Sequence, residues 1–271
     1  MGRHDAALSS TFDGPRLDGR VAFLSAAPGH LGSAMARALC CAGAHVIINA
    51  RDDAKLADFE AALLGEGHSV ERAAFDVADI ARVKDFFASL PRLDILVNNA
   101  IAMTPKPFAA LDASDFASTY ASSVTASFEA VRAALPALRG AASACGGASV
   151  INVASMYGIV APDARLYDEP GQQSPFHYGP AKAALLQLTR HLAAGLGPEN
   201  IRVNALVPGP FPREAVQAVN PAFAARLAAK TMLGRLGKAG EIAGPLLFLA
   251  SPASSFMTGQ ALTVDGGWTA W

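Results

Sequence analysis

A tyrosine and a lysine four residues apart are the side chains of this sequence best placed to move a proton. Tyr178 and Lys182 lie in a segment of helical character, where positions four apart share one face. A phenol has an ordinary pKa of about 10, and a neighbouring ammonium favours the phenolate and brings that pKa toward neutrality. The pair could therefore give a proton to a developing alkoxide or remove one from an alcohol. A Tyr-x-x-x-Lys motif alone also occurs by chance in many helices.

Ser155 joins this pair from a different part of the chain. The apolar segment 150–154 is typical of a buried strand, and Ser155 stands at its carboxyl end, where open α/β sheets bind their ligands. Its hydroxyl could stabilise charge that develops on a reacting oxygen. The segment 156–177 between Ser155 and Tyr178 is long, so it is either a loop that shapes substrate specificity or a surface insertion that packs on a neighbouring subunit.

The elements that must position these residues alternate along the chain. Strands are expected near 20–25, 45–49, 69–75, 93–97, 150–154 and 201–206, and helices near 30–42, 52–64, 79–89, 113–138 and 178–196. This alternation predicts an α/β fold with a parallel sheet and helices on both faces. The strands are rich in Val, Ile and Leu, as strands buried on both sides require. Residues 18–271 are expected to form one domain after a flexible arm over residues 1–17.

Composition narrows the classes of partner. The chain has 271 residues, of which 52% are hydrophobic and 17% charged, and its net charge is -1. This balance gives no reason to expect a nucleic acid or an anionic membrane as partner. The three cysteines lack the spacing of a disulfide framework or a metal site. With no apolar run of membrane-spanning length, the expectation is a cytoplasmic protein.

The order of short motifs resembles the short-chain dehydrogenase/reductase family from about residue 18 onward. The matching motifs are Asn98-Asn99-Ala100, the set Ser155, Tyr178 and Lys182, then Pro208-Gly209 and Val264-Asp265-Gly266-Gly267. The resemblance implies a single-domain, Rossmann-type, doubly wound sheet of about seven strands. It also implies an oxidoreductase that interconverts the carbonyl and secondary-alcohol forms of a small-molecule substrate, with the Ser-Tyr-Lys set catalytic. A homo-oligomer (tetramer or dimer) is implied as well.

By this resemblance, the turn after the first strand binds the pyrophosphate of a nicotinamide cofactor. Its candidate residues are Ser25, Ala27, Gly29, His30, Leu31 and Gly32. Ala26 replaces a glycine of the family pattern, and its Cβ is costly if φ is positive there. His30 begins the helix, where it could donate a hydrogen bond to phosphate or could partly close the site.

The end of the second strand bears on the choice of cofactor. An arginine at this point accommodates a 2′-phosphate, whereas a carboxylate selects NAD. Arg51 therefore favours NADP(H), with NAD(H) possible, unless it is a solvated side chain paired with Asp52 or Asp53. The resemblance adds further cofactor-binding candidates, namely Asp76, Val77, Asn99, Ala100, Pro208 and Gly209.

Two further departures from the family pattern concern the active site. Ser123 stands where the family has an asparagine that holds a relay water, and Ile101 replaces a glycine. A serine can hold a water with fewer donors. These changes leave open a second function, a nucleotide-binding or scaffold protein impaired in catalysis. In the segment 210–230, Arg213, Arg226 and Lys230 either suit an anionic substrate or form the solvated face of an amphipathic helix.

Overall fold

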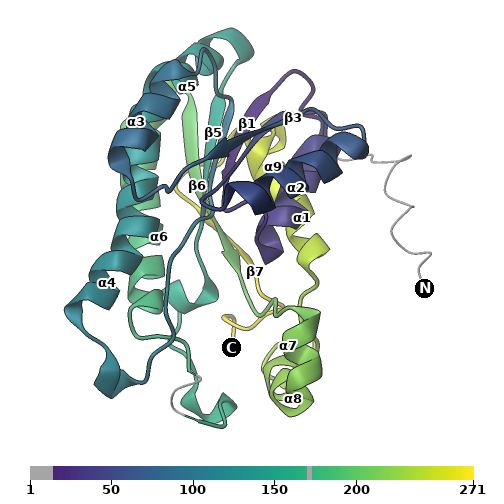
Figure 1. Ribbon diagram of the computed structural model, residues 1–271, viewed down its shortest axis with the longest axis vertical. Coiled ribbons are helices and arrows are strands. Elements are labelled where there is room, and N and C mark those ends of the chain that lie inside the picture. Colours follow the sequence, from purple (N-terminus) through teal and green to yellow (C-terminus); the bar gives the residue numbers. More distant parts are fainter. Residues whose placement is uncertain (1–14, 170–172) are drawn as a thin grey trace.

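The strands assemble into one parallel sheet. The structure, a computed structural model, describes residues 15–169 and 173–271 (Figure 1). The sheet has seven strands in the order β3-β2-β1-β4-β5-β6-β7. Their bounds are β1 Val21–Ser25, β2 His45–Ala50, β3 Val70–Ala74, β4 Ile95–Asn98, β5 Ala148–Val153, β6 Ile201–Pro208 and β7 Ala261–Val264. The chain order reverses between β1 and β4, which confirms the predicted doubly wound α/β fold and creates a switch point there.

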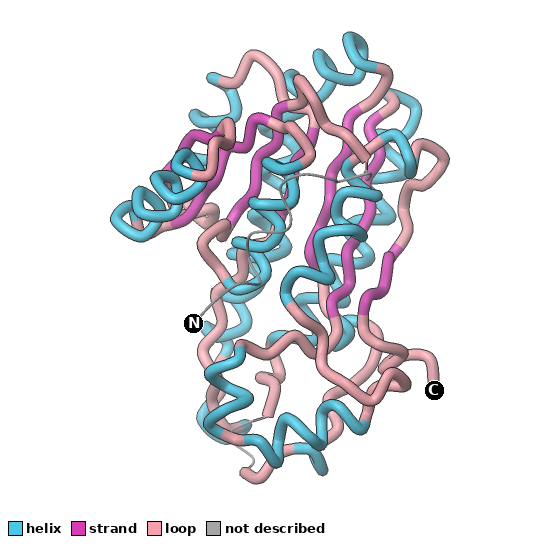
Figure 2. Tube along the Cα trace, turned by 90° about the vertical axis from the view of Figure 1, so that its right-hand side faces the viewer, coloured by secondary structure: helices cyan, strands magenta, loops and turns pink. Residues whose placement is uncertain are grey.

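Helices cover both faces of this sheet. They are α1 His30–Cys41, α2 Asp53–Gly65, α3 Ile80–Ser89, α4 Ala113–Tyr120, α5 Ala126–Cys145, α6 Tyr178–Leu196, α7 Glu214–Val219, α8 Pro221–Ala229 and α9 Ala243–Ala250. Figure 1 shows α1, α2 and α9 on one face and α3, α5 and α6 on the other; α7 and α8 lie beyond the end of the sheet. Figure 2, turned by 90°, shows the strands spread side by side, with helices overlapping them. Each face therefore has its own apolar core.

Local sequence signals account for where several helices begin. Asp52 accepts a hydrogen bond from the Lys55 amide at the start of α2, and Asp79 caps α3 in the same way. Asp112 opens α4 with a reciprocal capping box that includes Asp115. These side chains satisfy amide groups that a helix leaves unpaired at its first turn. Helices α2 and α3 therefore start within a few residues of the carboxyl ends of β2 and β3, whereas α4 follows a longer loop.

The structure differs from expectation in the predicted long helix over 113–138. A π-helical turn, Ala121–Thr125, separates α4 from α5, and α5 continues to Cys145. Ser123 lies in the middle of this turn. Since π-helical turns are frequent at functional sites, the interruption supports Ser123 as a candidate site residue.

The predicted N-terminal arm falls mostly outside the described residues. Leu17, its last residue, is buried and donates its N–H to the Ala42 carbonyl over 2.7 Å. Residue 17 thus packs on the domain. Across residues 15–169 and 173–271, no helix has both the length and the apolar character needed to cross a membrane.

Candidate active site

The candidate residues gather at the carboxyl edge of the sheet. They come from the ends of β1 to β6 and from the helices that follow, although they are spread over almost two hundred positions of the chain. Ser25, Val77, Asn98 and Ala100 line one small pocket at this edge. The fold thus brings together residues that the sequence places after six different strands.

Ser25 and Asn99 lock the ends of β1 and β4 to each other. The Ser25 hydroxyl oxygen accepts from the amides of Asn99 and Ala100 over 2.8 and 3.0 Å. In return, the Asn99 side-chain amide donates to the carbonyls of Ser25 and Ala26. Ser25 is buried, so its role is to hold the two cofactor-side turns together at the switch point.

The turn between β1 and α1 is tight and strained at one residue. Ala26 adopts a φ of 53°, which is the left-handed region that a glycine would occupy without cost. Gly29 precedes α1 in extended conformation, with φ of -68°. A Cβ on Gly32 would collide with the Ala26 carbonyl oxygen. The predicted conformational cost of Ala26 is confirmed by its positive φ. A glycine is required at position 32 because the Ala26 carbonyl oxygen lies where a Cβ would stand.

The start of α1 suits an anionic group. No side chain caps this helix, so its first N–H groups keep their donor capacity. The Nε2 atom of His30 is buried and has no hydrogen-bond partner among the described residues. An uncapped helix start beside an unpartnered imidazole nitrogen fits the pyrophosphate of a dinucleotide.

Arg51 lies at the end of β2 and reaches toward the neighbouring strand. Its guanidinium is 3.6 Å from the Asp76 carboxylate, and its side chain is 70% exposed. Asp52 and Asp53, its expected alternative partners, pair with Lys55 and Arg72. Arg51 and Asp76 therefore form a loose, open pair at the edge where an adenosine ribose would lie.

Close backbone packing holds the Ser155 and Tyr178 segments together. Ser155 begins a 3-10 turn, Met156–Gly158, that lies against the first turns of α6. A Cβ on Gly158 would stand 2.8 Å from the Lys182 carbonyl carbon, and one on Gly179 would stand 2.9 Å from the Tyr157 carbonyl oxygen. Only glycine fits at both positions, so main-chain contact sets the separation of the serine and the tyrosine.

The structure does not show the predicted effect of Lys182 on the pKa of Tyr178. Burial raises the pKa of Tyr178 above its ordinary value, and an interaction with the Ser155 hydroxyl opposes this. Lys182 Nζ donates to the Val153 carbonyl over 2.6 Å and lies 5.8 Å from the Tyr178 ring centroid. Burial lowers the pKa of Lys182 to about 7. The predicted lowering of the tyrosine pKa is therefore not seen in this geometry.

Ser123 lies fully buried in the π-helical turn. Its hydroxyl has no hydrogen-bond partner among the described residues, and its backbone carbonyl accepts from the Ser127 hydroxyl over 2.6 Å. A buried hydroxyl without a partner is costly unless a small polar molecule satisfies it. The position is therefore suited to holding one water.

Sequence reasoning missed a buried amide network beneath the site. Asn98 donates to Asn152 over 2.9 Å, Asn152 donates to the Thr189 hydroxyl over 2.9 Å, and Thr189 donates to the Leu185 carbonyl. This chain ties β4, β5 and α6 to one another. A polar residue at the same point of two adjacent apolar strands was the signal that could have found it.

His177, directly before Tyr178, was missed as well. It is fully buried, and its Nδ1 lies 3.0 Å from the Thr119 hydroxyl, which donates to the Ala102 carbonyl. Its Nε2 lies 3.4 Å from the Thr104 carbonyl. These polar contacts of His177 connect the start of α6 to α4 and to the loop after β4.

The described residues of the segment 156–177 pack on their own chain, against α8 and the residue that follows it. Asp168 pairs with Arg226 over 2.7 Å, and Asp163 pairs with Lys230 over 3.1 Å. Beneath these ion pairs, Met156, Leu166, Leu227 and Trp268 form a small apolar cluster. The predicted solvated face of α8 is therefore engaged by the insertion, and the two segments form one lobe.

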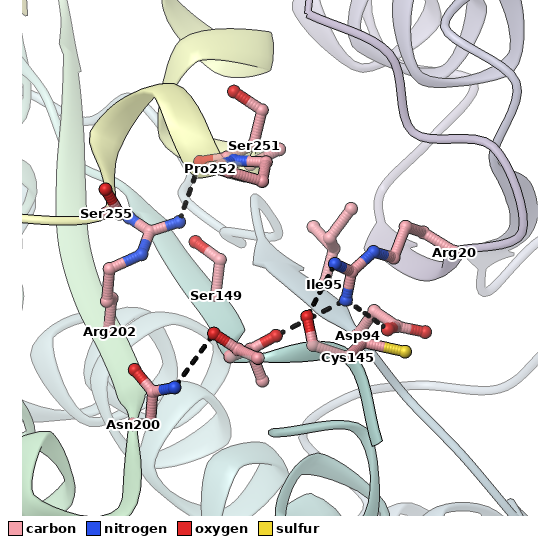
Figure 3. Close-up of a pocket in the computed structure, with 14 residues that line it drawn as sticks. Arg20, Asp94, Ile95, Cys145, Ser149, Asn200, Arg202, Ser251, Pro252 and Ser255 are labelled. Atoms are coloured by element: carbon pink, nitrogen blue, oxygen red, sulfur yellow. Dashed lines mark hydrogen bonds and ion pairs between the residues drawn. The ribbon is translucent and has the colours of Figure 1, made fainter. Parts of the chain in front are cut away.

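The opposite edge of the sheet carries a pocket of a different character. Figure 3 shows Arg20 and Arg202 at this pocket, with Asp94 beside Arg20. Arg20 pairs with Asp94 over 2.8 Å, and Arg202 donates to carbonyls at the end of α9, including that of Leu249. These arginines join elements of the fold. Within the described part of the chain, no group of three or more His, Cys, Asp or Glu side chains could hold a metal ion.

Comparison with known proteins agrees with this arrangement. A family profile described as enoyl-(acyl carrier protein) reductase matches residues 26–269. A rhamnolipids biosynthesis 3-oxoacyl-[acyl-carrier-protein] reductase of Pseudomonas aeruginosa is 35% identical over 256 residues, covering 93% of this chain and 96% of that protein. The gluconate 5-dehydrogenase of Gluconobacter oxydans is 32% identical over 263 residues, covering 93% and 96%.

Solved structures show the same fold. A gluconate 5-dehydrogenase from Burkholderia cenocepacia, in complex with NADP and tartrate, is 32% identical with a TM-score of 0.82 and covers 94% of this chain and 97% of that one. A Pseudomonas aeruginosa NADP active-site complex is 34% identical with a TM-score of 0.83, covering 94% and 98%. This chain belongs to the short-chain dehydrogenase/reductase family. It is an NAD(P)-dependent oxidoreductase of that family.

The strain at Ala26 predicts that a glycine there stabilises the protein. Relief of a left-handed alanine is worth about 1–2 kcal/mol, and the added chain entropy of glycine offsets about 0.5–1 kcal/mol. We expect Ala26→Gly to raise the melting temperature by roughly 1–4 °C in a thermal melt. Ala27→Gly is the matched control, since Ala27 is buried without a positive φ, and it should lower the melting temperature. A lower melting temperature for Ala26→Gly would contradict the assigned strain.

The buried Lys182 predicts a specific dependence of stability on pH. Its pKa is about 7 in the folded chain, so the unfolded chain, with an ordinary lysine, binds more protons above pH 7 and stability rises with pH. Cysteine titration in the unfolded state opposes this at higher pH. The measurement is therefore the difference in unfolding free energy between wild type and Lys182→Met, which should grow by up to about 2 kcal/mol from pH 7 to 8.5. If the unfolding free energies of wild type and Lys182→Met changed in parallel with pH, Lys182 would have to stay charged when buried.

Proposed function

We propose that this chain is an NADP(H)-preferring oxidoreductase that interconverts a carbonyl and a secondary alcohol through Ser155, Tyr178 and Lys182. The observation that carries the proposal is the packing of the 3-10 turn on α6. Gly158 and Gly179 let the two backbones touch there, and the serine and tyrosine are presented side by side at the ligand-binding edge.

The three side chains have separate tasks. Tyr178 holds the proton that goes to the carbonyl oxygen on reduction, and Ser155 donates a hydrogen bond to that oxygen as charge develops. Lys182, buried behind the tyrosine, becomes an ammonium when a phenolate or the ribose hydroxyls of the cofactor lie beside it. A bound nicotinamide supplies the hydride to the carbonyl carbon. Its pyrophosphate would lie at the start of α1, near His30.

A preference for NADP(H) is supported by Arg51. The guanidinium is exposed, lies at the end of β2, and is held only loosely by Asp76. A 2′-phosphate would replace this loose contact with charge-assisted hydrogen bonds. Two relatives of known structure contain NADP, which supports the same choice for this chain.

The proposal predicts that Tyr178→Phe loses turnover and keeps cofactor binding. Removal of a general acid costs about 10²–10⁴-fold in rate, whereas the ring that packs at the site remains. Turnover would be measured as NADPH oxidation over a panel of ketones, and binding by NADPH fluorescence. Tyr167→Phe is the control, because it removes a neighbouring phenol hydroxyl that bonds Tyr157, and it should stay within a few-fold of wild type. Unchanged turnover in Tyr178→Phe would refute the assigned proton donor.

The cofactor preference has its own test. We expect wild type to bind NADPH more tightly than NADH in parallel calorimetric titrations, and Arg51→Ala to weaken NADPH binding by about tenfold while NADH binding stays constant. Arg72→Ala, which removes an arginine paired with Glu60 on the same side of the sheet, should change neither. Equal affinity of wild type for the two cofactors would overturn the preference and leave the oxidoreductase assignment standing.

A further inference from the structure

Exposed apolar side chains gather on the segments around the catalytic pair. Met103 and Phe108 follow β4, Ile159 follows the Ser155 turn, and Phe176 directly precedes the catalytic helix. Phe108 is 71% exposed and Phe176 is 52% exposed. Exposed apolar side chains that cluster in one region often mark a place where a ligand or partner binds.

Two of these side chains form an aromatic wall. The rings of Phe108 and Phe176 lie with their centroids 4.8 Å apart, so the loop after β4 and the residues before α6 meet there. Phe176 is two residues from Tyr178, and the buried His177 between them is bonded to Thr119 and faces the Thr104 carbonyl. The wall therefore includes a residue of the short segment that leads into α6 and the proposed proton donor.

Apolar side chains also face solvent on the other side of the carboxyl edge. Val216 and Val219 are exposed on α7, and Met232 and Leu233 are exposed after α8. Figure 1 shows α7 and α8 extending beyond the carboxyl ends of the strands, across from α4 and the loop that leads into it. The segments on either side of the site therefore share an apolar character.

Three cations of these segments, Lys106, Arg226 and Lys230, are neutralised within the chain. Lys106 pairs with Asp115 over 2.6 Å, and Arg226 and Lys230 pair with carboxylates of the insertion. A hydrogen bond from the Asn220 amide and, after it, one from the Arg226 guanidinium hold the pKa of Asp168 below its ordinary value. An acidic substrate would have to displace these carboxylates. Among the described residues, Arg213 is the cation of these segments that has no ion pair.

We propose that the substrate is a neutral carbonyl compound, or its alcohol, with an extended apolar portion that packs on the Phe108–Phe176 wall. The proposal rests on the proposed function of Tyr178 and adds the substrate class. The wall is formed by the loop after β4 and the residues that lead into α6, the two segments that flank the proposed reacting groups. Three cations of the neighbouring segments are already paired with carboxylates of the chain, which disfavours selection of a sugar acid. The balanced reaction is hydride from NADPH to the carbonyl carbon and a proton from Tyr178 to the oxygen, which gives a secondary alcohol and NADP⁺.

The test is a homologous series of neutral 3-oxo ethyl esters from four to ten acyl carbons, reduced with NADPH. If each added methylene of the substrate is transferred from water onto the Phe108–Phe176 wall, kcat/KM should rise by up to about fourfold per methylene, equivalent to about 0.8 kcal/mol. Phe108→Ser and Phe176→Ser should each lower the ratio of long-chain to short-chain kcat/KM by about tenfold or more. The same enzyme with 5-ketogluconate should give a kcat/KM at least tenfold below that of the longest ester.

Controls separate this inference from the function on which it rests. Phe256→Ser removes a fully exposed phenylalanine after α9, near the opposite edge of the sheet, and should leave the whole series unchanged. A flat series, a slope unaffected by both wall variants, or better turnover of 5-ketogluconate would overturn the inference while Tyr178-dependent turnover still supports the oxidoreductase. No NADPH-dependent turnover of any of these compounds would count against the proposed function itself.

Discussion

The site depends on one close contact between two stretches of main chain. The turn that begins at Ser155 lies against α6 because Gly158 and Gly179 have no Cβ to hold the backbones apart. Two side chains from distant parts of the chain are thereby fixed relative to each other by peptide groups instead of flexible side chains. Such rigid positioning is what proton transfer to a developing alkoxide requires, because small displacements of a catalytic group are costly.

The remaining parts of the site are built outward from this contact by buried hydrogen bonds. Asn152 connects β5 to β4 and α6, and Asn99 connects the end of β4 to the turn after β1. Each buried polar atom of these networks finds its partner inside the chain, as burial demands. Among the described residues, the Ser123 hydroxyl and the His30 Nε2 are the buried side-chain atoms outside these networks that have no partner. Both leave hydrogen-bonding capacity for a water or a cofactor.

The insertion shows how ion pairing shapes recognition at the carboxyl edge. Its carboxylates Asp163 and Asp168 bind cations of α8 and of the segment that follows it. Exposed pairs of this kind contribute little to stability, about 0–1 kcal/mol each, but they remove charge from the surface that a substrate meets. Together with the apolar cluster below them, these ion pairs join the insertion and α8 into one lobe. Aromatic and aliphatic side chains remain exposed on the neighbouring segments.

The sequence by itself determined the α/β fold and the edge at which the site lies, because alternating apolar strands and helices admit few topologies and residues such as Ser155 and Asn99 directly follow strands. The sequence also predicted the backbone strain at Ala26, because an alanine stands there in place of a glycine of the family pattern. Only the tertiary structure decided that Lys182 bonds Val153, that His177 and Asn98 belong to the site, and that Asp168 meets Arg226. These contacts join residues from separate elements, and their partners are set by packing distances that no local pattern of residues encodes.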